Sequence, residues 1–138
     1  MNTIVDNQEV TLKKKIGVFY KDHVMSYDEQ PCPIKNILAD SLDKWSLFIM
    51  YNLGYFGVLR FNQLKNRIDG ISSRMLSSTL KKLEANHIVI RTVYAEVPPR
   101  VEYQLSDFGE KLTYRVIDLS QWYLQEYPKV AGVKHEPK

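Results

Sequence analysis

The chain of 138 residues is long enough for one domain with a single core, and its 44% hydrophobic and 25% charged residues are typical of a globular protein. No apolar run approaches the roughly 18 residues that a membrane-spanning helix needs, and the first residues show no signal-peptide pattern. Cys32 is the only cysteine, which excludes a disulfide within the chain. We therefore expect a cytoplasmic protein without membrane contact.

The first 30 residues are interpreted as an N-terminal arm whose structure the pattern leaves open. Apolar residues between Leu12 and Val24 have helical spacing, but Ile16, Val18 and Tyr20 alternate as in a strand. We expect the arm to add to a dimer interface. The sequence is accordingly divided into an arm (1–30), a main domain (31–128) and a flexible tail (129–138).

Two helices are predicted at the start of the main domain. Pro33 suits a first helical position and predicts a helix to about Ser41, because its missing N–H would have no partner there. Asp43 is a favourable N-cap for a second helix that ends near Gly54 and Gly57. The apolar face of this second helix consists of Trp45, Phe48, Ile49 and Leu53. Trp45 is interpreted as a core residue rather than as part of a ligand pocket.

A helix pair joined by a tight turn is predicted next. Leu59–Phe61 has the pattern of an isolated strand, and a short helix at Gln63–Arg67 precedes a turn. Ser72 is a good N-cap for a helix from Ser73 to about Ala85. The polar face of that helix consists of Ser73, Arg74, Ser77, Ser78, Lys81 and Lys82, and its apolar face of Met75, Leu76, Leu80 and Leu83.

The residues that follow alternate with the period of strands. Ile88–Tyr94 and Arg100–Leu105 predict a β-hairpin whose tip contains two prolines. Ser106 caps a last helix that we expect to reach Tyr127 and to stop at Pro128. The stripe expected to pack on the domain consists of Phe108, Leu112, Val116, Leu119 and Tyr123.

This order of elements is typical of a winged helix-turn-helix, an α+β and mainly helical fold with a two-stranded wing and a long C-terminal dimerisation helix. The helix at 73–85 is then the recognition helix. Between residues 60 and 100, eight cations stand against three anions, whereas the whole chain carries +3. Basic charge is therefore concentrated where DNA would lie. The candidate DNA-binding residues are Arg60, Ser72, Ser73, Arg74, Ser77, Ser78, Lys81, Arg91 and Arg100.

Four segments of the chain form a recognisable set. They are Cys32-Pro33, Lys44-Trp45-Ser46-Leu47, Arg60–Leu64 with Gly70–Leu76, and Arg91–Tyr103, of which the last is the most specific. Together they resemble the HxlR family of bacterial transcriptional regulators, relatives of the MarR-type winged helices. The resemblance implies a homodimer that binds an inverted-repeat DNA operator as a repressor or an activator. Some members respond to electrophiles through an N-terminal cysteine, whose position Cys32 matches.

Cys32 has two interpretations, and the sequence leaves both open. A thiol at a helix N-terminus beside Lys35 favours the thiolate, which fits a sensor of electrophiles or oxidants. The other interpretation is a small buried residue that ends a loop. An electrophile or an aromatic molecule is the small-molecule partner that the first interpretation implies.

The last helix has a second apolar strip that a monomer would leave in water. Tyr114, Ile117 and Leu124 form it, with Trp122 further round. A two-fold partner using the same surface would bury the strip on both chains. The candidate dimerisation residues are Ile117, Trp122, Tyr123 and Leu124.

Enzymatic function finds no support in the residue pattern. His23, His87 and His135 are scattered, no second cysteine accompanies them, and no nucleophile set or phosphate loop stands out. We therefore predict a transcriptional regulator, with repression the expected mode, that has no metal, no cofactor and no enzyme activity. The alternative is a winged-helix module that binds protein and not DNA, for which an uncharged recognition face would be expected.

Overall fold

The computed structural model describes residues 3–23, 34 and 38–132, and the chain divides into two compact units, Met1–Leu42 and Asp43–Lys138. In the first unit, α1 (Thr3–His23) is a continuous helix, so the strand alternative for the arm is wrong. The helix predicted from Pro33 to Ser41 lies mostly outside the described residues. Its described end contains a short 3-10 helix, η2 (Asp40–Leu42).

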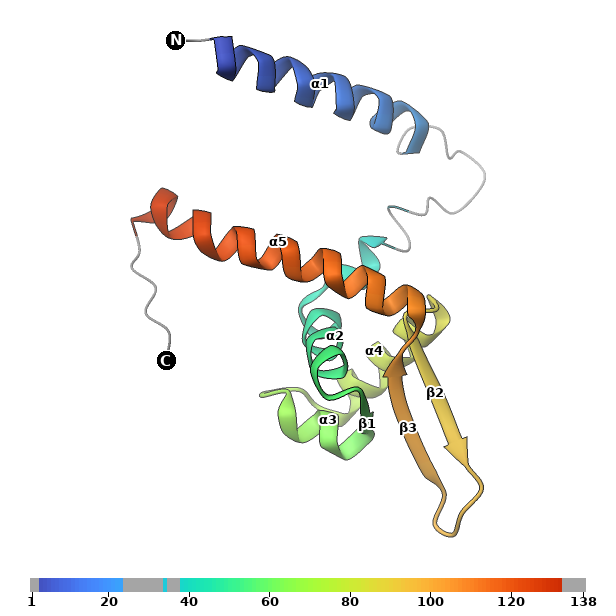
Figure 1. The fold of residues 1–138 in the computed structure, drawn as a ribbon. Helices are drawn as coiled ribbons and strands as arrows, with labels where there is room; N and C mark the ends of the chain where they lie inside the picture. Colours follow the sequence, from blue (N-terminus) through green and yellow to red (C-terminus); the bar gives the residue numbers. More distant parts are fainter. Residues whose placement is uncertain (1–2, 24–33, 35–37, 133–138) are drawn as a thin grey trace. The chain divides into compact units, whose positions relative to one another are not determined.

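The second unit is a winged helix-turn-helix, which confirms the predicted fold class (Figure 1). The helix pair consists of α3 and α4, and the β2–β3 hairpin forms the wing. The elements are α2 (Lys44–Phe56), β1 (Val58–Arg60), α3 (Phe61–Arg67), α4 (Ser73–Ala85), β2 (Val89–Tyr94), β3 (Arg100–Leu105) and α5 (Asp107–Ala131).

The sequence pattern predicted that the short strand β1 would be isolated, and this prediction is wrong. The strand pairs antiparallel with β3, with Leu59 opposite Tyr103, and gives a sheet of order β1-β3-β2. Leu59 and Tyr103 are both buried. The pairing joins residues more than forty positions apart, so periodicity along the chain carries no signal for it. Strand β1, which runs directly into α3, therefore anchors the base of the wing to that helix.

The three predicted N-caps are confirmed. The side chains of Asp43, Ser72 and Ser106 accept hydrogen bonds from the backbone N–H groups three residues ahead, at 2.9, 3.0 and 2.9 Å. Each bond satisfies an N–H that has no partner inside its helix. These caps fix the starts of α2, α4 and α5.

The core is formed by α2, α3, α4 and the sheet, and Trp45 packs against it as expected. Two predicted positions are wrong. Met75 is 42% exposed, whereas Thr79 is buried, with its hydroxyl satisfied by donating to the Met75 carbonyl at 2.7 Å. Phe48 is likewise 45% exposed. The largest fully buried apolar side chains are Ile49, Met50, Leu53, Leu64, Leu76, Leu80, Leu83 and Ile88.

The face of α5 that packs on the domain confirms the predicted stripe only in part, since Val116 is buried and Leu112 packs against the core. Gly109, Thr113 and Val116 are buried, whereas Phe108 and Leu119 of the predicted stripe are largely exposed. Small side chains let the helix approach closely, so size outweighs hydrophobicity at this contact. A Cβ on Gly109 would lie 2.1 Å from the carbonyl oxygen of Ile88.

The end of α5 is a further correction, because the helix passes through Pro128 to Ala131. Proline removes one backbone N–H and so breaks the hydrogen bond to the carbonyl four residues before it. Pro128 lies in the last turn, where that loss affects only the helix end. Gly132, with φ +67°, terminates the helix in the left-handed conformation.

Hydrogen bonds hold α5 at both ends of its contact with the domain. The Ser106 hydroxyl donates to the His87 carbonyl at 2.6 Å, and the Ser106 N–H donates to the Ile88 carbonyl at 3.0 Å. Further along, the hydroxyls of Ser120 and Tyr51 lie 2.6 Å apart. The start of α5 is therefore tied to the connection between α4 and β2, and its middle to α2.

An ion pair between Asp43 and Lys82 joins the start of α2 to the last turn of α4. Burial by itself raises the pKa of Asp43, but the Lys82 hydrogen bond and the Ser46 N–H and hydroxyl bonds outweigh it and hold the pKa below 3.8. The carboxylate is thus stabilised in its charged form. The pair sets the position of the recognition helix against α2.

Gly109→Ala should lower the free energy of unfolding by about 1–3 kcal/mol, because the new Cβ meets backbone that cannot move aside. Gly54→Ala is the matched control. Gly54 is also helical, but there a Cβ makes ordinary contacts at 3.5 and 3.8 Å, so stability should be unchanged or rise by up to about 1 kcal/mol. Urea unfolding measures both changes, and equal effects would contradict the close approach at Gly109.

Asp43→Asn should make the protein less sensitive to acid. The pKa of Asp43 is lower in the folded protein than in the unfolded chain. The ionised carboxylate therefore stabilises the fold at any pH above its ordinary pKa, and this stabilisation is lost as the pH falls through the lowered pKa. Asparagine keeps the N-cap but has no charge to lose. Urea unfolding at pH 7 and pH 3, at one protein concentration, measures the difference. A loss of stability as large in the variant as in the wild type would rule out this role.

Candidate nucleic-acid interface

The outward face of α4 carries the side chains that the sequence assigned to DNA. Arg74, Ser78 and Lys81 are exposed and recur at spacings of three and four, which places them on one face of the helix. Leu76 and Leu80 occupy the opposite face and are buried in the core. The face is rich in hydroxyls at its N-terminal end and cationic further along.

The four candidate serines differ in what their hydroxyls do. Ser72 caps α4, and Ser78 donates to the Met75 carbonyl at 3.1 Å. For Ser73 and Ser77, no hydrogen bond of the hydroxyl is found within the part of the chain that the structure describes. Ser73 and Ser77 are therefore better placed than Ser78, whose proton is already donated, to donate to an external acceptor.

The neighbouring lysines of α4 have different environments. Lys81 is exposed, whereas Lys82 is half-buried and paired with Asp43. The sequence pattern placed both on the polar face, because helical spacing does not show that Asp43 lies beside Lys82. Of these two lysines, only Lys81 adds its charge to the outward face of the helix.

The two arginines of the wing also differ. Arg100 lies 4.1 Å from the centre of the Tyr94 ring, and its guanidinium is 3.4 Å from Glu96 and 3.6 Å from Glu102. Arg91 is exposed and stands opposite Tyr103 in the middle of the ladder rather than beside the proline tip. Arg100 therefore organises the wing tip, while Arg91 projects an unbalanced charge.

Arg60 lies close to the wing although it precedes α3. Its exposed side chain lines a depression of about 520 Å³ together with Gln63, Pro99 and Arg100. The side chain of Gln63 fixes the local backbone, because its Oε1 accepts a hydrogen bond from the Arg60 N–H at 2.8 Å. The structure thus brings together two candidate residues from distant parts of the sequence, Arg60 and Arg100.

The candidate dimerisation residues lie on the outer part of α5, which extends past the rest of its unit (Figure 1). Trp122, Tyr123 and Leu124 are more than half exposed, and Ile117 is 38% exposed. Tyr123 stacks on Tyr127 with ring centres 5.2 Å apart. Cys32 lies outside the described residues.

Other kinds of site were sought in the described part of the chain. No group of three or more histidine, cysteine, aspartate and glutamate side chains is placed to hold a metal ion there. None of the helices found there has the length and apolar character needed to cross a bilayer.

Residues 42–130 match the HxlR-like helix-turn-helix family. The chain is 34% identical over 107 residues to the HTH-type transcriptional regulator YtfH of Escherichia coli, an alignment covering 78% of this chain and 84% of the relative. Among solved structures, the putative transcriptional regulator ytfH from Salmonella typhimurium has a TM-score of 0.65 at 31% identity and covers 78% of this chain and 95% of its own. The redox regulator HypR in its oxidised form has a TM-score of 0.60 at 37% identity, with 68% and 96% covered. The chain belongs to the HxlR-like helix-turn-helix family of transcriptional regulators.

Proposed function

We propose that the protein is a homodimeric repressor that binds an inverted-repeat operator in the cytoplasm and has no enzyme activity. The observation that carries the proposal is the outward face of α4, where Arg74 and Lys81 are exposed on a helix whose other face is locked in the core. A helix of this kind fits the major groove, where arginine bonds guanine edges and lysine neutralises phosphates.

The wing and α3 supply the remaining contacts in this proposal. Arg91 and Arg60 are exposed, and each adds a cation beside the recognition helix. Arg100 shares its charge with two carboxylates, so its part is to hold the wing tip in shape. Ser73 and Ser77 donate hydrogen bonds to bases or phosphates.

We further propose that the main domain begins near residue 31 and includes α5, and that the arm at 1–30 adds to the dimer interface. The exposed apolar strip of α5 supports the dimer, because a monomer leaves Trp122, Tyr123 and Leu124 in water. Two copies related by a two-fold axis place their recognition helices one helical turn apart on DNA.

A winged-helix module that binds protein instead of DNA is the alternative function. It would be favoured by a recognition face without charge. The exposed Arg74 and Lys81 argue against it.

Arg74→Ala should weaken operator binding by about 1–3 kcal/mol and relax sequence preference, because it removes a base contact. Lys81→Ala and Arg91→Ala should weaken binding to all sequences and flatten the dependence of affinity on salt. Gel-shift titrations on operator and random DNA at several salt concentrations measure these effects. Lys111→Ala is the control, since it removes an exposed cation from α5 and not from the outward face of α4, so the salt slope should not change. Unchanged operator affinity in Arg74→Ala would contradict the assigned reading face.

Ile117→Glu together with Leu124→Glu should split the dimer and abolish operator binding, although neither residue faces DNA. Burying two carboxylates in an apolar interface costs several kcal/mol. Sedimentation should give about twice the 16.2 kDa chain mass for the wild type and the chain mass for the variant. Lys111→Glu on the same helix is the charge-matched control. A wild-type species of one chain mass at micromolar concentration would overturn the dimer.

We propose that Cys32 senses electrophiles or oxidants, which the likeness to the redox regulator HypR supports. Because Cys32 is the only thiol, oxidation by diamide gives a disulfide between two chains, and a quinone gives an adduct. Either product should change operator affinity. Non-reducing gels, mass spectrometry and gel shifts compare the wild type with Cys32→Ser. The same response in both proteins, or none in either, would remove the sensor role.

A further inference from the structure

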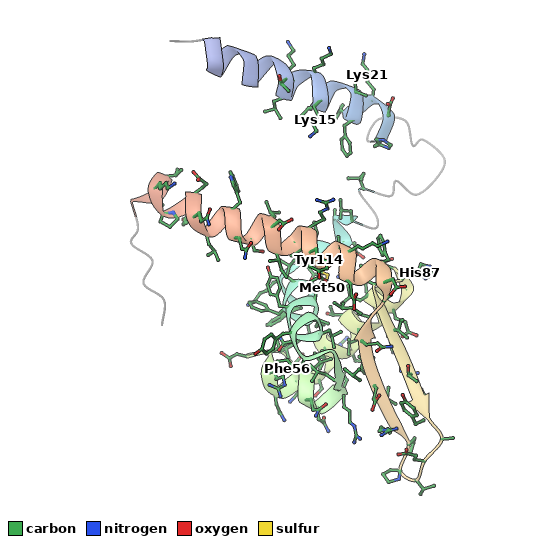
Figure 2. All side chains as sticks on the ribbon, viewed as in Figure 1. Lys15, Lys21, Met50, Phe56, His87 and Tyr114 are labelled. Atoms are coloured by element: carbon green, nitrogen blue, oxygen red, sulfur yellow. The ribbon has the colours of Figure 1, made fainter. Side chains whose placement is uncertain are left out.

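A cleft of about 400 Å³ lies between α2 and α5, away from the face that carries Arg74. Tyr51 and Tyr55 line it from α2, and Glu110, Tyr114 and Ile117 from α5. Figure 2 shows Tyr114 where α5 crosses α2. The volume of the cleft is within the range of about 300–1,000 Å³ that small-molecule sites occupy.

Gly54 keeps the floor of this cleft open. It lies in the last turn of α2, where glycine is less favourable than alanine by up to about 1 kcal/mol. A Cβ there would meet Thr113 and Leu105 at ordinary contact distances, so the helix packing does not require glycine. Both Thr113 and Leu105 line the cleft. A larger side chain at position 54 would therefore fill it.

The lining has the chemistry of a site for an organic cation. Three tyrosines, Tyr51, Tyr55 and Tyr114, line the space, and the faces of tyrosine rings attract cations. Glu110 is the one charged side chain of the lining, and within the described residues its carboxylate forms no ion pair. Lys111 and Arg115, its neighbours in sequence, are not among the lining residues.

The cleft touches the two elements on which operator binding depends. The start of α2 holds Lys82 of the recognition helix through Asp43, and α5 carries the proposed dimer contacts. The Tyr51–Ser120 hydrogen bond crosses between the same two helices beside the cleft. Tyr114 and Ile117 also belong to the apolar strip of the proposed dimer, so the partner copy would border this cleft. A molecule wedged between α2 and α5 would change the angle between them and so the spacing of the two recognition helices.

We propose that this cleft binds an aromatic organic cation and that the bound cation lowers operator affinity. The regulatory half of the inference rests on the proposed function. The binding half stands on the lining alone. Because coupling between two sites is reciprocal, operator DNA lowers the affinity for the cation by the same factor.

Tetraphenylphosphonium and tetraphenylborate are the matched probes, because they share a shape and differ in the sign of their charge. Isothermal titration of the full chain without DNA should show saturable binding of the phosphonium and none of the borate. The net charge of +3 favours the borate in non-specific binding, which makes the comparison stringent. Equal binding of both ions, or no binding of the phosphonium, overturns the site.

Variants locate the probe. Glu110→Gln should weaken phosphonium binding about fivefold, the upper range for an exposed ion pair, and Tyr114→Leu by a similar factor. Gly54→Leu should abolish binding by filling the cleft, whereas Gly54→Ala should keep it. Thermal unfolding shows whether each variant is folded. Unchanged binding in both Glu110→Gln and a folded Gly54→Leu places the probe elsewhere.

Gel shifts with and without the phosphonium test the coupling. The operator affinity of the wild type should fall, and that of Glu110→Gln should fall less at the same concentration. Phosphonium binding without any effect on operator affinity overturns the regulatory half only. A change in the mass of Gly54→Leu by sedimentation, without any probe, means that a second copy of the chain occupies the cleft and contradicts the proposal. Absence of operator binding by the wild type refutes the proposed function and leaves the titration result intact.

Discussion

The contact between Gly109 and the backbone of Ile88 is the constraint on which the rest of the structure depends. Ile88 follows the turn that ends α4 and precedes β2, so α5 is pressed against the point where recognition helix and wing meet. The Ser106 bonds to the His87 and Ile88 carbonyls close the same junction. A helix held here is packed against the junction of α4 and β2, the two elements that the proposed function places on DNA. The orientation of α5 therefore determines where they point.

A second consequence concerns how the basic charge is used. Lys82 and Arg100 are paired with carboxylates, while Lys81 and Arg91 are exposed. The paired cations hold α4 and the wing tip in place, and the exposed ones are those that the proposed function assigns to phosphates. This division keeps the proposed DNA-binding surface rigid while the cations exposed on it stay unpaired with carboxylates among the described residues.

The local features of the fold follow from the sequence, and the non-local ones do not. Ser72 and Ser106 were predicted as caps because a cap depends on residues three positions away. The pairing of β1 with β3 and the Asp43–Lys82 ion pair join distant residues, so no periodicity shows them. On α5, the apolar stripe was a misleading guide, because Gly109 and Thr113 pack closer than large side chains can. For the candidate site, the exposed face of α4 was predictable, but the partners of Arg100 were not.

The central claim is that two copies, joined through α5, present their recognition helices to successive turns of DNA. Hydroxyl-radical footprinting of the wild-type protein on DNA fragments selected by binding tests it most directly. The account predicts two protected half-sites on one face of the duplex, separated by about one helical turn of 10–10.5 base pairs. A single protected half-site would contradict it, and so would one continuous protected stretch in which two half-sites cannot be distinguished.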